Sequence, residues 1–208
     1  MFKHELIDTN PINLCRVDVD GQRHYKVPSG KLYKSVTTVL GSIHKEHIEM
    51  WKQAVGEEAA ALIAAKASRR GTIVHHMCEC LLLNKPINTD DRGKMLMPIH
   101  VEMFSELKAF IENNVDSVMG VELRMFSDEL ELAGTVDCLC VLNGVRTVVD
   151  FKTSSSVKEK TSIDNYFLQA AAYSIMTKER YGITMEQLCI AITTEHEGLQ
   201  VFIEPRRS

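Results

Sequence analysis

The stretch Val148-Val149-Asp150-Phe151-Lys152-Thr153 decides how the rest of the chain is interpreted. Its β-branched and aromatic residues predict a strand, in which successive side chains point to opposite faces. Asp150 and Lys152 therefore share one face, and Val149 and Phe151 point into the opposite layer. A carboxylate and an ammonium group placed in this way can act on one small volume, although such a pair at a strand end is also common as a surface salt bridge.

A second carboxylate lies on the strand predicted just before this one. Asp137 ends the segment 133–137 (Ala-Gly-Thr-Val-Asp), thirteen residues before Asp150. Asn143-Gly144 predicts a tight hairpin turn, so antiparallel pairing can bring the two carboxylates close together. Two carboxylates at such a distance repel each other unless a cation lies between them. Oxygen ligands of this kind suit Mg²⁺ or Mn²⁺, which bind phosphate oxygens and activate water.

From residue 98 onward, the patterns of apolar and turn residues predict a fixed order of elements: helix, three strands, helix, two strands. The expected helices span 98–113 and 162–181, and the expected strands span 118–126, 130–142, 145–153, 187–193 and 199–203. This order indicates an α/β (α+β) fold, in which a central mixed sheet is flanked by helices.

The residues before 98 form a different kind of region. A hairpin of 14–19 and 22–27 is expected around the turn Asp20-Gly21. Helical periodicity follows from Thr37 to about Leu83, and three glycines divide it, namely Gly41, Gly56 and Gly71. We therefore expect residues 1–97 to form an N-terminal hairpin and helical region and 98–208 to form the core, within one compact domain overall.

Composition sets limits on the class of protein. The 208 residues are 45% apolar and 25% charged, which is typical of a globular chain. The net charge of −4 argues against a protein that simply coats nucleic acid, although the carboxylates of a metal site lower the net charge of a nuclease. No segment approaches the ~20 apolar residues of a membrane span, and no signal peptide is recognised. We expect a protein of the cytoplasm without membrane contact.

The short motifs together resemble a known superfamily. Asp137 followed by Asp150-Phe151-Lys152 resembles the D…(D/E)XK signature of the PD-(D/E)XK nucleases, and the predicted order of elements resembles their common core. Arg70-Gly71-Thr72 with His75 and Glu79 resembles the R-G-T-x-x-H-x-x-x-E element of the RecB-like branch. His75 and Glu79 share one helix face. In that branch the histidine is an additional metal ligand, a role for which the adjacent histidine could compete here.

Two further motifs extend the resemblance. Tyr166, Gln169 and Tyr173 share one face of the expected helix and resemble the Q-x-x-x-Y element that supports the metal site and contacts the DNA strand. Glu122 resembles the acidic residue on the first core strand, which lies near the metal or the attacking water. Upstream, residues 34–40 followed by Trp51 resemble phage exonucleases that are related to the mitochondrial genome maintenance exonuclease.

The resemblance spans roughly residues 33–182 and implies a restriction-endonuclease-like core with three sets of site residues. The implied catalytic residues are Asp137, Asp150, Lys152, Glu122, Gln169 and Tyr173. The implied metal ligands are His75, Asp137, Asp150 and the main-chain carbonyl of Phe151, with Glu79 less favoured. The implied nucleic-acid-binding residues are Arg70, Thr72, Thr153, Tyr166 and Trp51.

The function implied by the resemblance is that of a deoxyribonuclease dependent on Mg²⁺ or Mn²⁺. We expect an exonuclease that acts on single-stranded DNA or DNA ends in phage-type replication or recombination, with a replication or recombination protein as partner, in the host cytoplasm if a phage encodes it. Two alternatives remain open: a structure-specific endonuclease, or a DNA-binding recombination module with weak catalysis. The sequence predicts no oligomeric state.

The cysteines bear on one subgroup of these nucleases, which holds an iron–sulfur cluster with one early and three late cysteines. Only Cys189 follows the helix 162–181, so that arrangement is missing. Cys138 and Cys140 alternate with Asp137 and should point away from the catalytic face. We therefore expect no iron–sulfur cluster and interpret all six cysteines as plain thiols.

Overall fold

The computed structural model describes residues 1–8, 12, 14–43 and 45–206, with the side chains of 45–47 left out of the description. Its helices are α1 (Val36–Ile43), α2 (Lys45–Val55), α3 (Glu57–Leu82), α4 (Pro98–Asn114) and α5 (Asp164–Tyr181), preceded by the short 3₁₀ turn Lys160–Ser162. Its strands are β1 (Lys3–His4), β2 (Cys15–Val19), β3 (Gln22–Lys26), β4 (Leu32–Ser35), β5 (Val115–Ser127), β6 (Leu132–Leu142), β7 (Val145–Ser154), β8 (Gln187–Thr194) and β9 (Leu199–Pro205). None of the helices in the described residues is long and apolar enough to cross a membrane.

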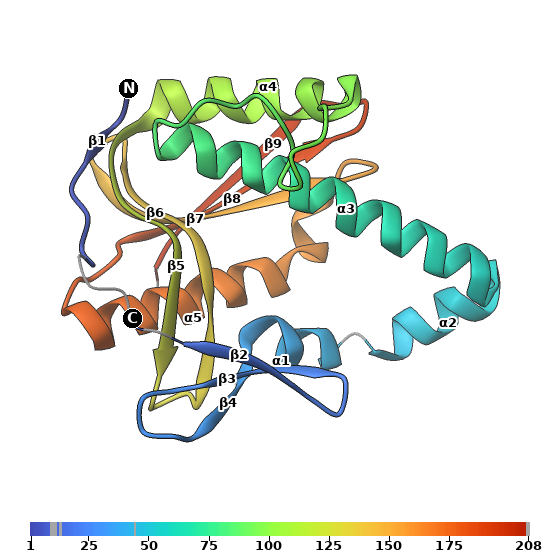
Figure 1. Cartoon of the computed structure of the whole chain (residues 1–208), viewed down its shortest axis with the longest axis horizontal. Helices are drawn as coiled ribbons and strands as arrows, with labels where there is room; N and C mark the ends of the chain where they lie inside the picture. The colour runs from blue at the N-terminus through green and yellow to red at the C-terminus, as the bar shows by residue number, and fades with distance from the viewer. Residues whose placement is uncertain (9–11, 13, 44, 207–208) are drawn as a thin grey trace.

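The described strands form one mixed sheet with helices on both faces (Figure 1). Its order is β2-β3-β4-β6-β7-β8-β9, and β5 pairs with both β6 and the short β1. Helices α3 and α4 cover one face and bury residues such as Val74, Met77 and Leu107. Helix α5 covers the other face with Ala170, Tyr173 and Met176 among its buried residues. The predicted fold class, a central mixed sheet flanked by helices, is confirmed.

Strand β6 determines where the sheet opens. Along one edge it pairs with β5 over most of its length. On its other edge, Leu132 and Ala133 pair in parallel with β4, whereas Cys138 to Leu142 pair antiparallel with β7. Residues 134–137 lie between these two pairings, so β4 and β7 separate there. In Figure 1, β5 and β6 bend from the upper strands toward the β2–β4 layer below.

Local sequence accounts for the element boundaries. Asp20 and Gly21 have φ angles of 52° and 73°, and Asn143 and Gly144 have 49° and 81°. These left-handed pairs are the turns that suit the twist of two-residue hairpins, so both predicted hairpin turns are confirmed. Helix α4 begins with Pro98 in its first turn, where the missing N–H costs nothing.

The predicted division of the N-terminal helices is correct at one glycine and wrong at two. Gly56 separates α2 from α3, as expected. Gly41 and Gly71 instead lie inside α1 and α3. A single glycine costs a helix only about 1 kcal/mol, and the packing of the second half of α3 on the sheet outweighs this cost. Strands β1 and β4 were not expected, because segments of two and four residues carry too little periodicity to be recognised.

Candidate active site

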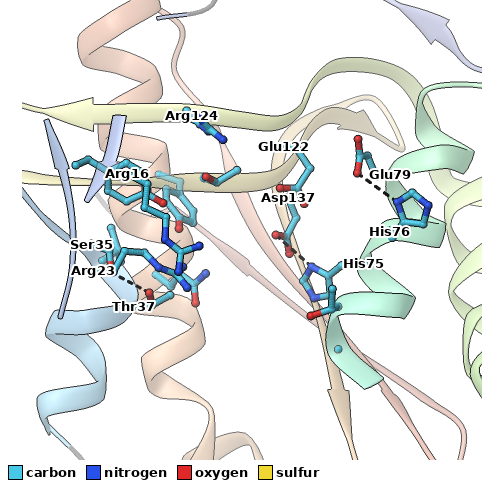
Figure 2. Close-up of a pocket in the computed structure, with 18 of the residues that line it drawn as sticks. Arg16, Arg23, Ser35, Thr37, His75, His76, Glu79, Glu122, Arg124 and Asp137 are labelled. Atoms are coloured by element: carbon cyan, nitrogen blue, oxygen red, sulfur yellow. Dashed lines mark hydrogen bonds and ion pairs between the residues drawn. The ribbon is translucent and has the colours of Figure 1, made fainter. Parts of the chain in front are cut away.

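A cleft of about 720 Å³ lies where β4 and β7 separate. It is lined by the middle of α3 on one side and by the β2–β3 hairpin with the start of α1 on the other, with β5, β6 and α5 between them (Figure 2). The motifs that the sequence distributes over more than 100 positions therefore meet around one open space.

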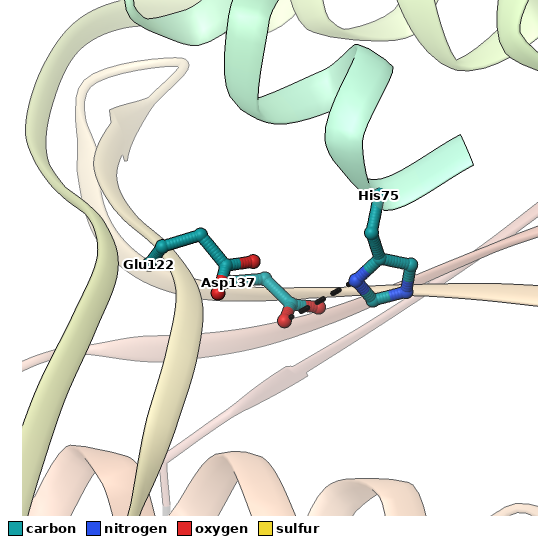
Figure 3. A group of neighbouring side chains, drawn as sticks. All are labelled: His75, Glu122 and Asp137. Atoms are coloured by element: carbon teal, nitrogen blue, oxygen red, sulfur yellow. Dashed lines mark ion pairs between the residues drawn. The ribbon is translucent and has the colours of Figure 1, made fainter. Parts of the chain in front are cut away.

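Three potential metal ligands converge in this cleft. His75 of α3, Glu122 of β5 and Asp137 of β6 each offer one ligand atom, and these atoms all lie within 4.8 Å of one another (Figure 3). The Nδ1 atom of His75 is 3.5 Å from Oδ1 of Asp137. An imidazole with two carboxylates is a donor set that suits divalent cations such as Mn²⁺ and Mg²⁺.

The backbone of β5 changes conformation at Glu122. Val121 pairs with Cys138 and Leu123 pairs with Val136, so Glu122 lies opposite Asp137 without a regular pairing of its own. Its φ angle is 47°, in the left-handed region that side chains other than glycine adopt at a cost of about 1–2 kcal/mol. Such strain is commonly found at functional sites. Here it brings the Glu122 carboxyl group beside Asp137.

Asp150 is almost completely buried, with 1% of its surface exposed. Lys152 forms a close ion pair with its Oδ2 atom, whereas Oδ1 of Asp150 has no partner among the described residues. Val149 and Phe151 pack into the core beneath α3 and α4, so the predicted alternation along this strand is confirmed. A buried carboxylate with one unpaired oxygen is costly unless a further cationic group or hydrogen-bond donor stabilises it.

A main-chain contact joins Asp137 to the strand that carries Asp150. The Phe151 N–H donates a hydrogen bond to Oδ2 of Asp137 at 2.8 Å. This bond fixes the Asp137 carboxylate next to the segment 150–152. The role predicted for Phe151 concerns its carbonyl group and stays a prediction.

The charges in the cleft are unbalanced. Burial and the charge of Asp137 raise the pKa of Asp150 to about 6, despite the opposing effect of Lys152. Although the cleft leaves the Glu122 side chain open to solvent, desolvation of its carboxyl group and the charge of Asp137 raise its pKa to about 7. Burial would raise the pKa of Asp137, but His75, Lys152 and the Phe151 N–H lower it overall. Three carboxyl groups thus face one ammonium group and one imidazole, and a divalent cation would relieve the repulsion among the carboxylates.

Two groups that are cationic when protonated have raised pKa values in this setting. Burial disfavours the charged form of Lys152, but Asp150 and Asp137 outweigh burial and raise its pKa. The pKa of His75 is also raised, because the charge and hydrogen bond of Asp137 exceed the effect of burial.

Helix α5 holds Lys152 from the other side. The Lys152 Nζ atom donates to Oε1 of Gln169 at 3.4 Å and lies 5.2 Å from the centre of the Tyr166 ring. Tyr173 is buried against β6, where a Cβ atom at Gly134 would come within 2.8 Å of its ring and hydroxyl group. The three residues predicted to share one helix face, Tyr166, Gln169 and Tyr173, therefore lie next to Lys152 or the start of β6.

The other residues predicted for this site from α3 take different positions. Glu79 lines the cleft, but its carboxylate lies 3.9 Å from Nδ1 of His76 and outside the group of three ligands. Thr72 also lines the cleft, and its hydroxyl group donates to the Ser68 carbonyl. Arg70 is buried and pairs with Glu195, which places it away from the cleft lining.

Trp51 and Thr153 complete the predicted set. Trp51 lies on α2 with 38% of its surface exposed, and it does not belong to the residues that line the cleft. The Thr153 hydroxyl lies beside Gly71, 3.6 Å from the place of a Cβ atom there. That proximity joins β7 to α3 near His75.

Three arginines on the cleft were not predicted as site residues. Arg16 and Arg23 come from the β2–β3 hairpin, and Arg124 comes from β5. Alternation along the predicted hairpin places Arg16 and Arg23 on one face, since Arg16 pairs with Tyr25 and Arg23 with Asp18. The sequence did not show what that face meets, because the contact depends on the pairing of β4 with β6.

The cysteines lie mainly in the core. Cys78, Cys138, Cys140 and Cys189 belong to the cluster beneath α3 and α4, and burial raises the thiol pKa of Cys78 and Cys189. Cys138 and Cys140 thus point into the core, as their alternation with Asp137 predicts.

The fold and site define the class of protein: a mixed α/β protein whose divided sheet places a histidine, several carboxylates and a lysine in one cleft. No family model matches the chain, and no curated protein matches it. Among solved structures, a protein of Eubacterium rectale described as a "Putative exonuclease" is similar at a TM-score of 0.37 and 15% identity, over 84% of this chain and 60% of that one. The chain thus spans less than two thirds of that protein, and a likeness at this level adds nothing to what the site itself indicates.

Proposed function

We propose that the protein is a metal-dependent nuclease that hydrolyses phosphodiester bonds of DNA. The observation that carries this proposal is the buried Asp150 carboxylate, which pairs with Lys152 through Oδ2 and leaves Oδ1 without a partner among the described residues. Asp137, bonded to the same strand, completes a constellation that resembles the D…(D/E)XK signature of the PD-(D/E)XK nucleases. The additional histidine at position 75 fits the RecB-like branch of that superfamily.

The residues present fit a divalent cation. The ligand atoms of His75, Glu122 and Asp137 already lie within 4.8 Å of one another, and Asp150 supplies a further carboxylate whose Oδ1 atom has no partner among the described residues. We propose these four side chains and the Phe151 carbonyl as the residues that hold the cation. When bound, Mg²⁺ or Mn²⁺ polarises the phosphate and activates water. A histidine among the ligands makes Mn²⁺ well tolerated.

Lys152 is the group that acts on the reacting phosphate. Its raised pKa keeps the proton on Nζ, and its contacts with Asp150, Gln169 and Tyr166 fix the position of the ammonium group. A fixed positive charge stabilises the negative charge that develops on the phosphate oxygens. Gln169 and Tyr173 position this lysine and the start of β6, and no side chain has to act as a nucleophile.

We propose exonuclease action on single-stranded DNA or DNA ends, in phage-type replication or recombination. This finer proposal is supported by the resemblance of residues 34–40 and Trp51 to phage exonucleases. A structure-specific endonuclease would use the same group of residues, so the form of the substrate distinguishes the two activities.

The test is digestion of end-labelled linear and of circular single-stranded DNA with Mg²⁺ or Mn²⁺. The proteins compared are wild type, Asp150→Asn and Lys152→Gln, with Lys108→Gln on the outer face of α4 as the matched control. We expect wild type and the control to degrade only the linear strand, and both site variants to lose about 100-fold or more in rate.

Two results would contradict the proposal at different levels. Cutting of circular strands would replace exonuclease action by endonuclease action. The absence of wild-type cleavage of single- and double-stranded DNA with either metal would overturn the assignment as a nuclease.

A further inference from the structure

The wall of the cleft opposite the metal ligands is basic. Three arginines line this side of the cleft: Arg16 of β2, Arg23 of β3 and Arg124 of β5. Figure 2 shows Arg16 and Arg23 on one side of the cleft and His75 on the other, with Glu122 and Asp137 between them. We name Arg16, Arg23 and Arg124 the arginine wall.

No arginine of the arginine wall forms an ion pair among the described residues, although the charge of Arg124 acts to lower the pKa of Glu122. Arg69, Arg70 and Arg180, in contrast, each form an ion pair with a carboxylate. In the arginine wall, the Arg124 guanidinium donates at 3.2 Å to the carbonyl oxygen of Leu14, which is a neutral acceptor. As far as the described side chains of residues 1–8, 12, 14–43 and 48–206 show, the three guanidinium groups therefore keep most of their donors for a ligand.

The hairpin itself keeps an acidic neighbour away from Arg23. Asp18 lies directly across from Arg23, where an ion pair would be expected. Its carboxylate instead accepts a hydrogen bond from the Gly21 N–H at 2.9 Å and closes the turn. The charge of Arg23 is therefore not neutralised by the residue best placed to do so.

The sheet fixes this hairpin relative to the metal ligands. Tyr25, which pairs with Arg16, is buried, and β3 pairs with β4 from His24 to Lys26. Strand β4 then pairs with Ala133, four residues before Asp137 on β6. The arginine wall and the carboxylates Glu122 and Asp137 are thus parts of one continuous sheet, which sets the distance between them.

We propose that the arginine wall binds backbone phosphates of the nucleic acid strand whose neighbouring phosphate lies at the metal ligands. The proposal rests on the proposed nuclease function and adds to it the surface that holds the strand. Guanidinium groups bind phosphate through paired, charge-assisted hydrogen bonds. Because phosphate contacts carry no base information, this wall positions the strand without selecting a sequence.

The experiment measures kcat/KM for a labelled single-stranded thymidine oligonucleotide with Mn²⁺ at several salt concentrations. The variants are Arg16→Gln, Arg23→Gln and the double variant, with Arg146→Gln as the control. Arg146 is also an exposed strand arginine without an ion pair in the described residues, but it lies outside the cleft. Calorimetric titration with Mn²⁺ and the thermal unfolding midpoint are measured for every variant.

We expect kcat/KM to fall about tenfold for each arginine removed, mainly through KM, because each substitution removes charge-assisted hydrogen bonds to the strand. The slope of log(kcat/KM) against log salt should become shallower by ~0.7 for each phosphate that the variant no longer binds. Mn²⁺ binding and the unfolding midpoint should match those of the control.

Failure of the arginine wall and failure of the nuclease assignment give different results. If wild type cleaves the strand but the double variant keeps the kcat/KM and salt slope of Arg146→Gln, the arginine wall is wrong and the nuclease function stands. The same conclusion follows if the double variant loses Mn²⁺ binding along with cleavage, because the arginines would then act through the fold. If wild type cleaves no nucleic acid, the nuclease function is overturned, and this inference with it.

Discussion

At the scale of single residues, Glu122 connects backbone strain with the chemistry of the cleft. Its φ of 47° is one that a glycine adopts without cost, yet the position carries a carboxyl group that lies beside Asp137 and His75. The strained conformation is retained although a glycine would relieve it. This is the behaviour expected when a side chain is needed at a particular place.

Replacement of Glu122 should reveal this strain. We expect Glu122→Gly to be more stable than Glu122→Ala by roughly 0.5–1 kcal/mol, because alanine in the left-handed region is strained and glycine is not. Urea denaturation of the two metal-free variants measures the difference. At Lys108 in α4, the same two substitutions should give the opposite result, with the alanine variant more stable than the glycine variant. If the same variant were the more stable one at both positions, the interpretation would be contradicted.

The carboxyl groups of the cleft also predict how metal binding depends on pH. Glu122 and Asp150 have pKa values raised to about 7 and about 6, and the pKa of His75 is raised as well. A cation must displace the protons that these groups hold at lower pH, so affinity for Mn²⁺ should weaken as the pH falls below about 7. For each proton that metal binding releases, the affinity for Mn²⁺ should fall about tenfold for each pH unit below the pKa of the group.

Calorimetric titration with Mn²⁺ between about pH 5.5 and 8 measures this dependence. In Glu122→Gln the decrease should be less steep, because one of the groups that bind protons is gone. An affinity of wild type that does not change over this range would show that the protonation states derived from burial and charge are wrong.

At the scale of elements, the contact between β6 and α5 determines the position of residues in the candidate site. A Cβ atom at Gly134 would lie 2.8 Å from the ring and hydroxyl group of Tyr173, whose side chain is buried and has little room to move. Tyr173 and Gln169 belong to the same face of α5, and Gln169 accepts a hydrogen bond from Lys152. A shift of this helix therefore changes the position of the lysine.

We expect Gly134→Ala to destabilise the protein by about 1–3 kcal/mol and to lower the cleavage rate, because the tyrosine ring must move. The matched control is Gly41→Ala in α1, where a Cβ atom meets open space. That variant should gain roughly 0.5–1 kcal/mol, since alanine favours the helix. Denaturant unfolding and cleavage assays measure both, and a Gly134→Ala variant as stable and active as wild type would exclude the tight contact.

At the scale of the whole molecule, the N-terminal region and the core share one sheet and one hydrophobic cluster. β4 pairs with β6, and β1 pairs with β5. Helix α3 contributes Val74, Met77 and Leu82 to the cluster that also holds Phe151. Both regions also contribute to the candidate site, since His75 comes from the first region and Asp137 from the second. We therefore propose one cooperative domain across residues 1–208.

A fragment of residues 98–208 tests this proposal. We expect it to lack a cooperative unfolding transition, because it exposes the sheet face that α3 covers. Circular dichroism with urea measures the transition, and the full chain is the reference. A fragment that unfolds cooperatively would show that the core is a domain of its own.

Local sequence patterns were enough to predict the features that depend on near neighbours along the chain. Alternation placed Asp150 and Lys152 on one strand face, and Asn143-Gly144 gave the hairpin that brings Asp137 beside them, because side-chain period and turn geometry are local properties. The order of elements after residue 98 and the class of the fold follow from the same local signals.

The distant segments that form the walls of the cleft could be identified from the folded chain alone. The pairing of β4 with β6, the strained backbone of Glu122, the burial of Arg70 against Glu195 and the position of the arginine wall depend on contacts between segments far apart in the chain. Local patterns cannot specify such contacts, because the free energy that selects them comes from burying surfaces that meet only in the folded chain.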